Sequence, residues 1–147
     1  MMTPALFYCI LAVAQMHSVP PAVIYAIREV EGGKVGAVTY NRNGSYDIGP
    51  MQINNQAWLG ELAARWSVSK AKAEAMIKYD ECTNVEAATW ILAQRIRETG
   101  NLWLGVAAYH NYKPKYGGPY LQKVVARIER NIALQRRQMM QQTGRRQ

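Results

Sequence analysis

The segment VTYNRNGSYDIGP (residues 38–50) interrupts a chain whose pattern is otherwise helical. Two short runs of β-prone side chains lie within it, at residues 38–40 and 46–48. Between these runs, Asn43-Gly44 is a strong signal for a hairpin turn. The Gly-Pro pair that closes the segment then breaks the chain. We therefore expect one small β-hairpin within a helical protein.

On both sides of the hairpin, apolar residues recur at helical spacing. Ser18 is expected to cap the second helix at its N-terminus, and a Gly-Gly pair at residues 32–33 is expected to end it. The stretch KPKYGGP, from Lys113, is expected to separate the last two helices. The expected helices span residues 4–16, 19–31, 55–66, 69–79, 84–99, 102–110 and about 119–138.

The size and composition of the chain fit one mainly α domain with a single core. It has 147 residues, 49% of them apolar, and no repeat or interdomain linker. No apolar run approaches the roughly 18 to 20 residues that a membrane span requires. We expect the domain to cover residues 1–140, followed by a basic tail at residues 141–147 that is disordered.

Positive charge is concentrated in the last part of the chain. The net charge is +8, and the stretch from Leu121 to Gln147 holds seven basic residues and one acidic residue. Such a segment favours a polyanionic partner: cell wall, anionic lipid or nucleic acid. The alternative is an ordinary solvated helix with a frayed end.

The two cysteines, Cys9 and Cys82, allow two interpretations. They can form one disulfide, or they can be two buried thiols in a reducing compartment, and their spacing does not decide between these. The N-terminal stretch PALFYCILAVAQ has a small-x-small site at residues 12–14 but lacks a basic region, and cleavage there would discard Cys9. We expect this stretch to be the first helix of the folded domain, which leaves the export route undefined.

The stretch AIREVEGG (residues 26–33) places a glutamate where a helix ends. Projected at about 100° per residue, Ile24 and Ile27 lie within about 40° of Glu31, whereas Glu29 lies about 200° away. We therefore expect Glu31 to lean toward the buried side and Glu29 to face water.

Burial and the negative helix end both raise the pKa of a carboxyl group at position 31. A carboxylic acid that stays protonated near neutral pH can act as a general acid. Arg28 would oppose this if it paired with Glu31. The alternative is an ordinary terminal glutamate that reaches solvent.

Other kinds of catalytic group are missing from the sequence pattern. His17 and His110 have no metal-ligand spacing with the cysteines, and no phosphate-binding glycine loop or nucleophile elbow occurs. We expect no metal and no cofactor. The carboxylates, amides and tyrosines that remain suit a sugar substrate.

Four motifs in this order resemble the catalytic domain of bacterial lytic transglycosylases. They are EGG at Glu31, NRNGSYDIGPMQIN from Asn41, CTNVEAATWILAQRI from Cys82 and AAYHNY from Ala107. The resemblance covers about residues 5 to 125 and is nearest to the small, specialised branch that accompanies pili, conjugation and secretion machines. It implies a lysozyme-like helical domain in which the β-hairpin lines the substrate cleft.

The resemblance also implies roles for individual residues. Glu31 matches the single catalytic carboxylate of the family, and Tyr109 matches a tyrosine close to that acid. The GPMQIN element places Met51, Gln52 and Asn54 in the groove, in contact with the sugar. Either Asn54 or Asn55 is also expected to cap the next helix.

Other positions follow the family pattern less closely. His110 replaces a commoner asparagine after the tyrosine and is expected next to the groove, and Pro50 replaces a small residue before the methionine. Family members with cysteines at positions 9 and 82 are disulfide-bonded and periplasmic, which implies the same for this chain.

The implied reaction is cleavage of the MurNAc-GlcNAc bond of peptidoglycan with formation of a 1,6-anhydro ring. The implied partners are peptidoglycan glycan strands and components of a secretion, conjugation or pilus machine, and we expect a monomer with no specific nucleic acid.

Three alternatives remain open. Asp47 can be the second carboxylate of a lysozyme-like hydrolase, or it can merely organise the hairpin through local hydrogen bonds. The chain can be a noncatalytic peptidoglycan-binding component. It can also be a nucleic-acid binder that acts through its basic C-terminal segment.

Overall fold

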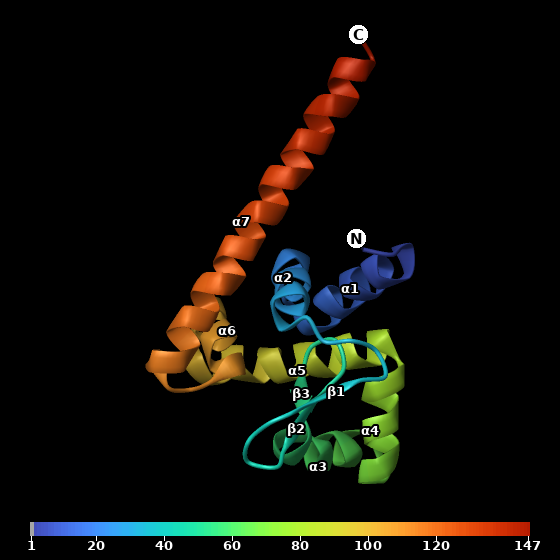
Figure 1. The fold of residues 1–147 in the computed structure, drawn as a ribbon, viewed down its shortest axis with the longest axis vertical. Helices are drawn as coiled ribbons and strands as arrows, with labels where there is room; N and C mark the ends of the chain where they lie inside the picture. Colours follow the sequence, from blue (N-terminus) through green and yellow to red (C-terminus); the bar gives the residue numbers. More distant parts are fainter. Residues whose placement is uncertain (1) are drawn as a thin grey trace.

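Helix α5 (Glu81–Thr99) runs through the middle of the computed structural model, which describes residues 2–147. In Figure 1 the two N-terminal helices lie on one side of α5, and the sheet with α3 and α4 lies on the other. Asp80 caps α5 by accepting a hydrogen bond from the Thr83 N–H, and Gly100 ends it in the left-handed conformation. Core residues contributed by all these elements pack around this helix.

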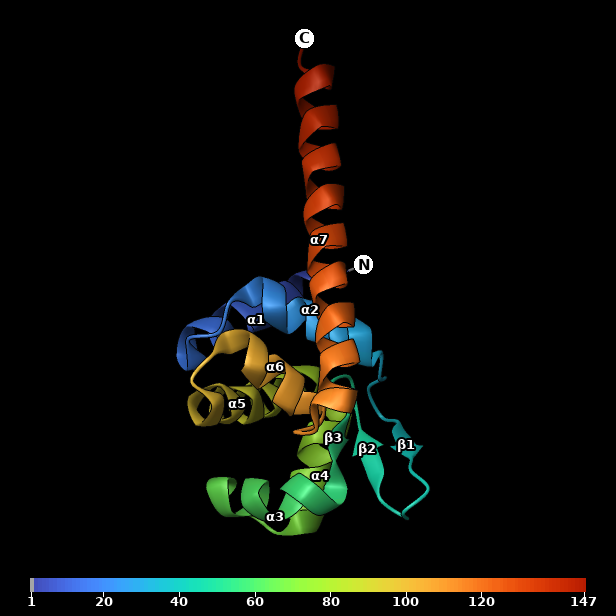
Figure 2. The same cartoon turned by 90° about the vertical axis from the view of Figure 1, so that its left-hand side faces the viewer.

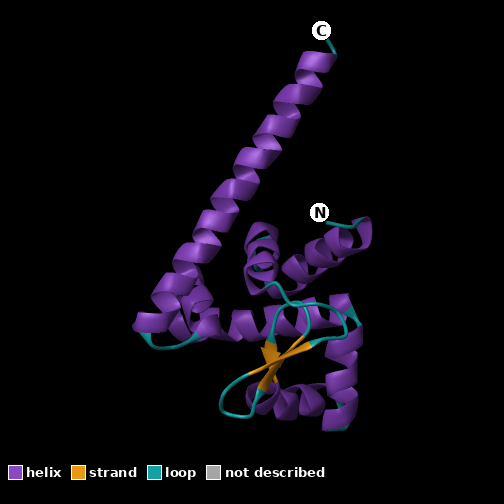
Figure 3. Ribbon diagram, in the orientation of Figure 1, coloured by secondary structure: helices purple, strands orange, loops and turns teal. Residues whose placement is uncertain are grey.

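The mainly α fold class is confirmed. Over residues 2–147, seven helices and one small antiparallel sheet are present, and Figure 3 shows the sheet as a short patch between helices. The remaining elements are α1 (Pro4–His17), α2 (Pro21–Glu31), β1 (Val38–Tyr40), β2 (Tyr46–Ile48), β3 (Ile53–Asn54), α3 (Asn55–Trp66), α4 (Lys70–Tyr79), α6 (Leu102–His110) and α7 (Pro114–Arg145).

The expected hairpin is present as β1 and β2, and its turn brings Tyr40 opposite Tyr46. The structure adds strand β3, in which Asn54 pairs with Asp47 of β2. Two residues are too few for a strand pattern to be recognised in a sequence. Of the two expected cap residues, Asn54 caps α3, because its side-chain oxygen accepts the Ala57 N–H at 3.0 Å.

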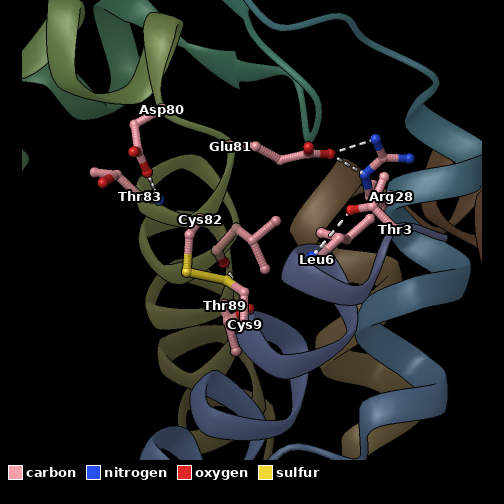
Figure 4. The surroundings of a disulfide bond; sticks show 10 residues. Thr3, Leu6, Cys9, Arg28, Asp80, Glu81, Cys82, Thr83 and Thr89 are labelled. Carbon is pink, nitrogen blue, oxygen red and sulfur yellow. Dashed lines mark hydrogen bonds and ion pairs between the residues drawn. A yellow bond between two sulfur atoms is a disulfide. The ribbon is translucent and has the colours of Figure 1, made fainter.

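A disulfide between Cys9 and Cys82 ties α1 to the first turn of α5, as Figure 4 shows. In the chain-entropy model a bond that closes a loop of this length contributes about 4 kcal/mol of stability. Helix α1 is part of the folded domain, as expected, since five of its side chains are buried in the core. Among residues 2–147 no single helix is both long and apolar enough to cross a membrane, whereas α1 and α2 together have that composition across a 120° bend.

The predicted N-terminal cap of α2 is wrong. Ser18 does not cap α2; it ends α1 with a φ of 55°, and its backbone N–H donates to the Ala14 carbonyl. Helix α2 instead begins with Pro21 in its first turn, where the missing N–H of proline costs no helical hydrogen bond.

The stretch KPKYGGP does not separate two helices, because α7 already begins at Pro114. Gly117 lets α7 lie against the preceding segment, since a Cβ there would come within 2.6 Å of the Asn111 carbonyl oxygen. This close packing of α7 on α6 outweighs the low helix propensity of the glycines.

Helix α7 then extends far beyond the rest of the protein (Figures 1 and 2). Its 32 residues correspond to about 48 Å at 1.5 Å per residue. Every residue from 132 onward is exposed. The helix includes residues 141–145, where the sequence favours a disordered tail, and a domain boundary at residue 140 stays a prediction.

Candidate active site

The carboxyl group of Glu31 stands at the end of α2 because two glycines follow it. Gly32 takes the left-handed conformation with a φ of 64° and ends the helix. Gly33 then lies directly against the backbone of Gly49, and a Cβ at Gly33 would come 1.9 Å from the Gly49 carbonyl oxygen. The Gly33 N–H donates to the Pro50 carbonyl at 3.2 Å. The end of α2 is therefore held against the turn that follows the hairpin.

Asn84 of α5 holds this turn from the other side. Its fully buried side chain donates to the carbonyls of Ile48 and Ile77 at 3.0 Å each and accepts the Met51 N–H at 2.9 Å. Sequence analysis did not select Asn84. A polar side chain on the apolar face of an alanine-rich helix is nevertheless a signal, because buried amides are found where backbone groups need partners.

Six of the seven residues expected at the site line one groove of about 590 Å³. These are Glu31, Asp47, Gln52, Asn54, Tyr109 and His110. Met51 does not match the expectation that it lines the groove, because its side chain is fully buried in the core. Its backbone carbonyl instead accepts a hydrogen bond from the Tyr109 hydroxyl at 2.9 Å.

A second hollow, of about 300 Å³, also borders Glu31 and is lined by Lys115, Tyr116 and Lys123 of α7. Glu31 and His110 border both hollows. An extended chain that occupies both would therefore pass directly over the Glu31 carboxyl group.

Tyr120 of α7 contacts Glu31 directly, and sequence analysis missed it. Its hydroxyl donates to a Glu31 carboxyl oxygen at 2.8 Å. Its ring stacks on His110 with centroids 4.6 Å apart. The two partners, Glu31 and Tyr120, are 89 residues apart, and Tyr120 falls within an ordinary helical pattern, so no local signal points to it.

Burial raises the pKa of Glu31 from about 4.5 to about 7. The hydrogen bond from Tyr120 acts in the opposite direction, and the negative charge of Asp47 adds to the increase. A large fraction of Glu31 is therefore protonated near neutral pH, as the helix projection predicts. Burial also raises the pKa of the hydroxyl groups of Tyr109 and Tyr120, so both stay neutral hydrogen-bond donors.

The charged neighbours of Glu31 on α2 are bound elsewhere. Arg28 donates from Nε to Glu81 of α5 at 2.8 Å, as Figure 4 shows, so it does not neutralise Glu31. The expectation that Glu29 faces water is wrong. Glu29 accepts hydrogen bonds from Arg127 and Asn131, because α7 packs against that face of α2.

Asp47 shares the groove with Glu31 and is bound by a neighbour in the sheet. One of its carboxylate oxygens accepts the Asn54 side-chain N–H at 3.0 Å, and the two residues face each other across β2 and β3. Asn54 also donates to the Ser45 hydroxyl, which ties the turn of the hairpin to the groove wall.

The raised pKa of Glu31 predicts a specific pH dependence of stability. Between about pH 4.5 and 7 the unfolded state releases the proton of Glu31 while the folded state keeps it, so stability falls as pH rises. A shift of this size corresponds to about 3 kcal/mol. From pH 4 to pH 8 the wild type should lose about 3 kcal/mol of stability that Glu31→Gln does not lose. We therefore expect the free energy of unfolding of Glu31→Gln, minus that of the wild type, to be about 3 kcal/mol larger at pH 8 than at pH 4.

This is measured by urea unfolding of both proteins from pH 4 to 8, with Glu61→Gln, an exposed glutamate of α3, as the control. Parallel pH profiles for the wild type and Glu31→Gln would contradict the raised pKa.

A helical domain with a short sheet in one wall of a groove and a buried carboxylic acid at a helix end in that groove has a lysozyme-like fold. Across residues 2–147, no three His, Cys, Asp or Glu side chains come together as a metal site. The family model of the transglycosylase SLT domain matches residues 8–129, and the chain belongs to this family.

Relatives with similar sequences come from Salmonella and Shigella. The chain is 31% identical over 103 residues to "Invasion protein IagB" of Salmonella typhimurium (strain SL1344). It is 30% identical over 97 residues to "Protein IpgF" of Shigella flexneri. These alignments cover 69% and 65% of this chain, but only 61% and 60% of the relatives' own lengths.

Proposed function

We propose that this protein is a peptidoglycan lytic transglycosylase that cleaves the β-1,4 bond between MurNAc and GlcNAc. The observation that carries the proposal is the Glu31 carboxyl group, which burial keeps partly protonated in a groove of about 590 Å³. Membership of the SLT family supports the same assignment.

In the proposed reaction, Glu31 donates its proton to the glycosidic oxygen as the bond to C1 of MurNAc breaks, so that GlcNAc leaves as an alcohol. Positive charge develops at C1, and the acetamido group of the same sugar stabilises it. The C6 hydroxyl then attacks C1, and the Glu31 carboxylate takes the hydroxyl proton. The ring closes as 1,6-anhydro-MurNAc, and Glu31 ends the cycle protonated. Intramolecular attack is favoured because the nucleophile is already part of the substrate.

The other groove residues have supporting roles in this proposal. Gln52 offers an amide group to the sugar, and Tyr109 lines the groove beside the acid. Asn54 shapes the groove wall, because its side-chain amide is bound to Ser45, Asp47 and Ala57. His110 braces the Tyr120 ring by stacking. Burial lowers the pKa of His110, so this residue is neutral near pH 7 and adds no positive charge next to Glu31.

A lysozyme-like hydrolase is the second candidate because Asp47 faces the same groove. The hydrogen bond between Asp47 and Asn54 favours a structural role for this carboxylate. On the transglycosylase proposal, Asp47→Asn retains the reaction, whereas a hydrolase that uses Asp47 loses most of its activity.

We place the protein in the periplasm, where a disulfide persists and peptidoglycan is accessible. One of its relatives is named an invasion protein, which supports a role in opening the cell wall locally for a secretion, conjugation or pilus apparatus.

The decisive experiment is digestion of purified sacculi followed by mass spectrometry of the soluble muropeptides. The proposal expects anhydro products, each about one water (~18 Da) lighter than the corresponding lysozyme product. Products with reducing ends would make the protein a hydrolase. Sacculi that bind the protein but stay intact would indicate a noncatalytic binding component.

Tyr120→Phe is expected to shift the pH dependence of this activity. The hydroxyl group of Tyr120 lowers the pKa of Glu31, so its removal raises that pKa further. Since the reaction needs protonated Glu31, the alkaline limb of the pH–rate profile should move to higher pH. Phe keeps the stacking on His110, and Tyr8→Phe, at an exposed position of α1, is the matched control. An unchanged alkaline limb would show that the hydroxyl does not influence the acid.

A further inference from the structure

A third hollow lies away from Glu31, between α1, α2 and α7. We call it the α7 groove; it has a volume of about 620 Å³. One wall carries Phe7 and Leu11 of α1, and the other carries Ile128, Ile132 and Leu134 of α7. Four of these side chains are more than 40% exposed: Phe7, Leu11, Ile132 and Leu134. Large apolar side chains that converge on a hollow usually mark a binding surface.

The arrangement of the helices makes this surface unusual. Figures 1 and 2 show α7 continuing past α1 and α2 into solvent. An isolated helical stretch with exposed apolar residues is not stabilised by its own packing, because helices in proteins depend mostly on burial of an apolar face. A partner that fills the α7 groove would bury that face along both walls.

Positive charge exceeds negative charge along the α7 wall of the groove. Helix α1 carries no Lys, Arg, Asp or Glu. Three charged residues line the groove: Glu29 of α2, and Arg127 and Arg130 of α7. Glu29 is paired with Arg127, which leaves Arg130 as the lining charge outside this pair. Arg136 and Arg137 follow on the same helix, outside the lining, and add positive charge nearby. An occupant of complementary charge is therefore acidic along the edge that faces α7.

The shape of the groove favours a helix as its occupant. The lining residues of α7 span twelve positions, or about 17 Å, which matches three turns of an α-helix. An extended peptide in a groove walled by side chains would leave its own N–H and C=O groups without partners, whereas a helix satisfies them internally. An amphipathic helix can place apolar side chains at i, i+3/i+4 and i+7 between the two walls.

We propose that the α7 groove docks an acidic amphipathic helix of a partner protein, independently of catalysis at Glu31. A second copy of this chain fits poorly, since each copy carries a net charge of +8. A membrane surface also fits poorly, because a flat surface cannot contact both walls of a groove.

The test uses a fluorescent peptide of about 18 residues with leucines at i, i+3/i+4 and i+7 and glutamates elsewhere, titrated with the full chain and followed by anisotropy. We expect saturable binding that weakens at least tenfold in Ile132→Asp and in Leu134→Asp. Arg130→Glu should also weaken it, and so should raised salt. Ala133→Asp is the matched control, because residue 133 is exposed on the opposite face of α7 and should leave binding unchanged.

Two further peptides provide specificity controls: a scrambled version of the same composition, and one with lysine in place of glutamate. Equal binding of either peptide, or no saturable binding of the acidic one, would overturn the proposal. So would concentration-dependent dimers in light scattering that Ile132→Asp dissociates, or flotation with phosphatidylglycerol vesicles that the same variant abolishes. Glu31→Gln should bind the peptide normally, and Ile132→Asp should still digest sacculi, so the docking and catalytic proposals fail separately.

Discussion

Glu31→Gln is expected to reduce the release of anhydro-muropeptides from sacculi by about 10³-fold, within the range that one general acid–base group contributes. The amide has nearly the same shape and can still accept the Tyr120 hydroxyl hydrogen bond, so the groove should stay intact. The variant should therefore sediment with sacculi as the wild type does. Lost cleavage with retained binding is the signature of a missing proton donor rather than of a damaged fold.

The control for this change is Glu61→Gln, which makes the same substitution at an exposed position of α3 outside both hollows. It should digest sacculi at the wild-type rate. A Glu31→Gln protein that still cuts at full speed would remove the basis of the proposed reaction. Fluorescence of solubilised fragments gives the rate, and mass spectrometry identifies the product.

Gly33→Ala should have the largest structural effect of any single methyl group added near the site. The new Cβ would overlap the carbonyl of Gly49 at 1.9 Å and approach the Gln52 side chain at 2.6 Å. The end of α2 and the groove wall must then move apart, which should cost about 3 kcal/mol of stability. Displacement of the wall by about 1 Å relative to Glu31 should also lower activity by about 100-fold in the protein that remains folded.

Gly118→Ala is the matched substitution. A Cβ at Gly118 meets no atom within 4 Å, and the residue lies inside α7. Alanine there should raise stability by up to about 1 kcal/mol, because it is the better helix former. Thermal unfolding and sacculus digestion of the two variants make the comparison. If Gly33→Ala is as stable and active as Gly118→Ala, the contact between the two backbones has no importance for the site.

The fold was predictable where local chemistry decides it. The hairpin follows from Asn43-Gly44, the α6 boundaries follow from the apolar pattern of residues 102–110, and the cap of α3 follows from Asn54. The start of α7 was not predictable, because a glycine-rich stretch became helical through tertiary packing against the preceding segment. Helix propensity is a weak guide wherever a long-range contact competes with it.

The candidate site was likewise predictable only where local sequence decides the position of a side chain. The buried position of Glu31 follows from the helical period and the two glycines, so it could be derived before the structure was known. The donor that holds Glu31, Tyr120, comes from a helix near the other end of the sequence. Likewise, the partner of Arg28 lies 53 residues away, and no period or spacing links the two. Met51 lies in a turn, where a one-residue difference decides whether a side chain faces the core or the groove.

Cys82, which forms the disulfide with Cys9, lies only two positions before Asn84 in α5. The Asn84 side chain holds the turn after β2 through hydrogen bonds to Ile48 and Met51. The covalent link therefore braces the part of the molecule that holds the Glu31 carboxyl group. Under a mild reductant, the first turn of α5 would gain freedom before the rest of the core melts. On the proposed function, loss of sacculus digestion should then precede loss of helicity, and full activity would require the oxidised protein.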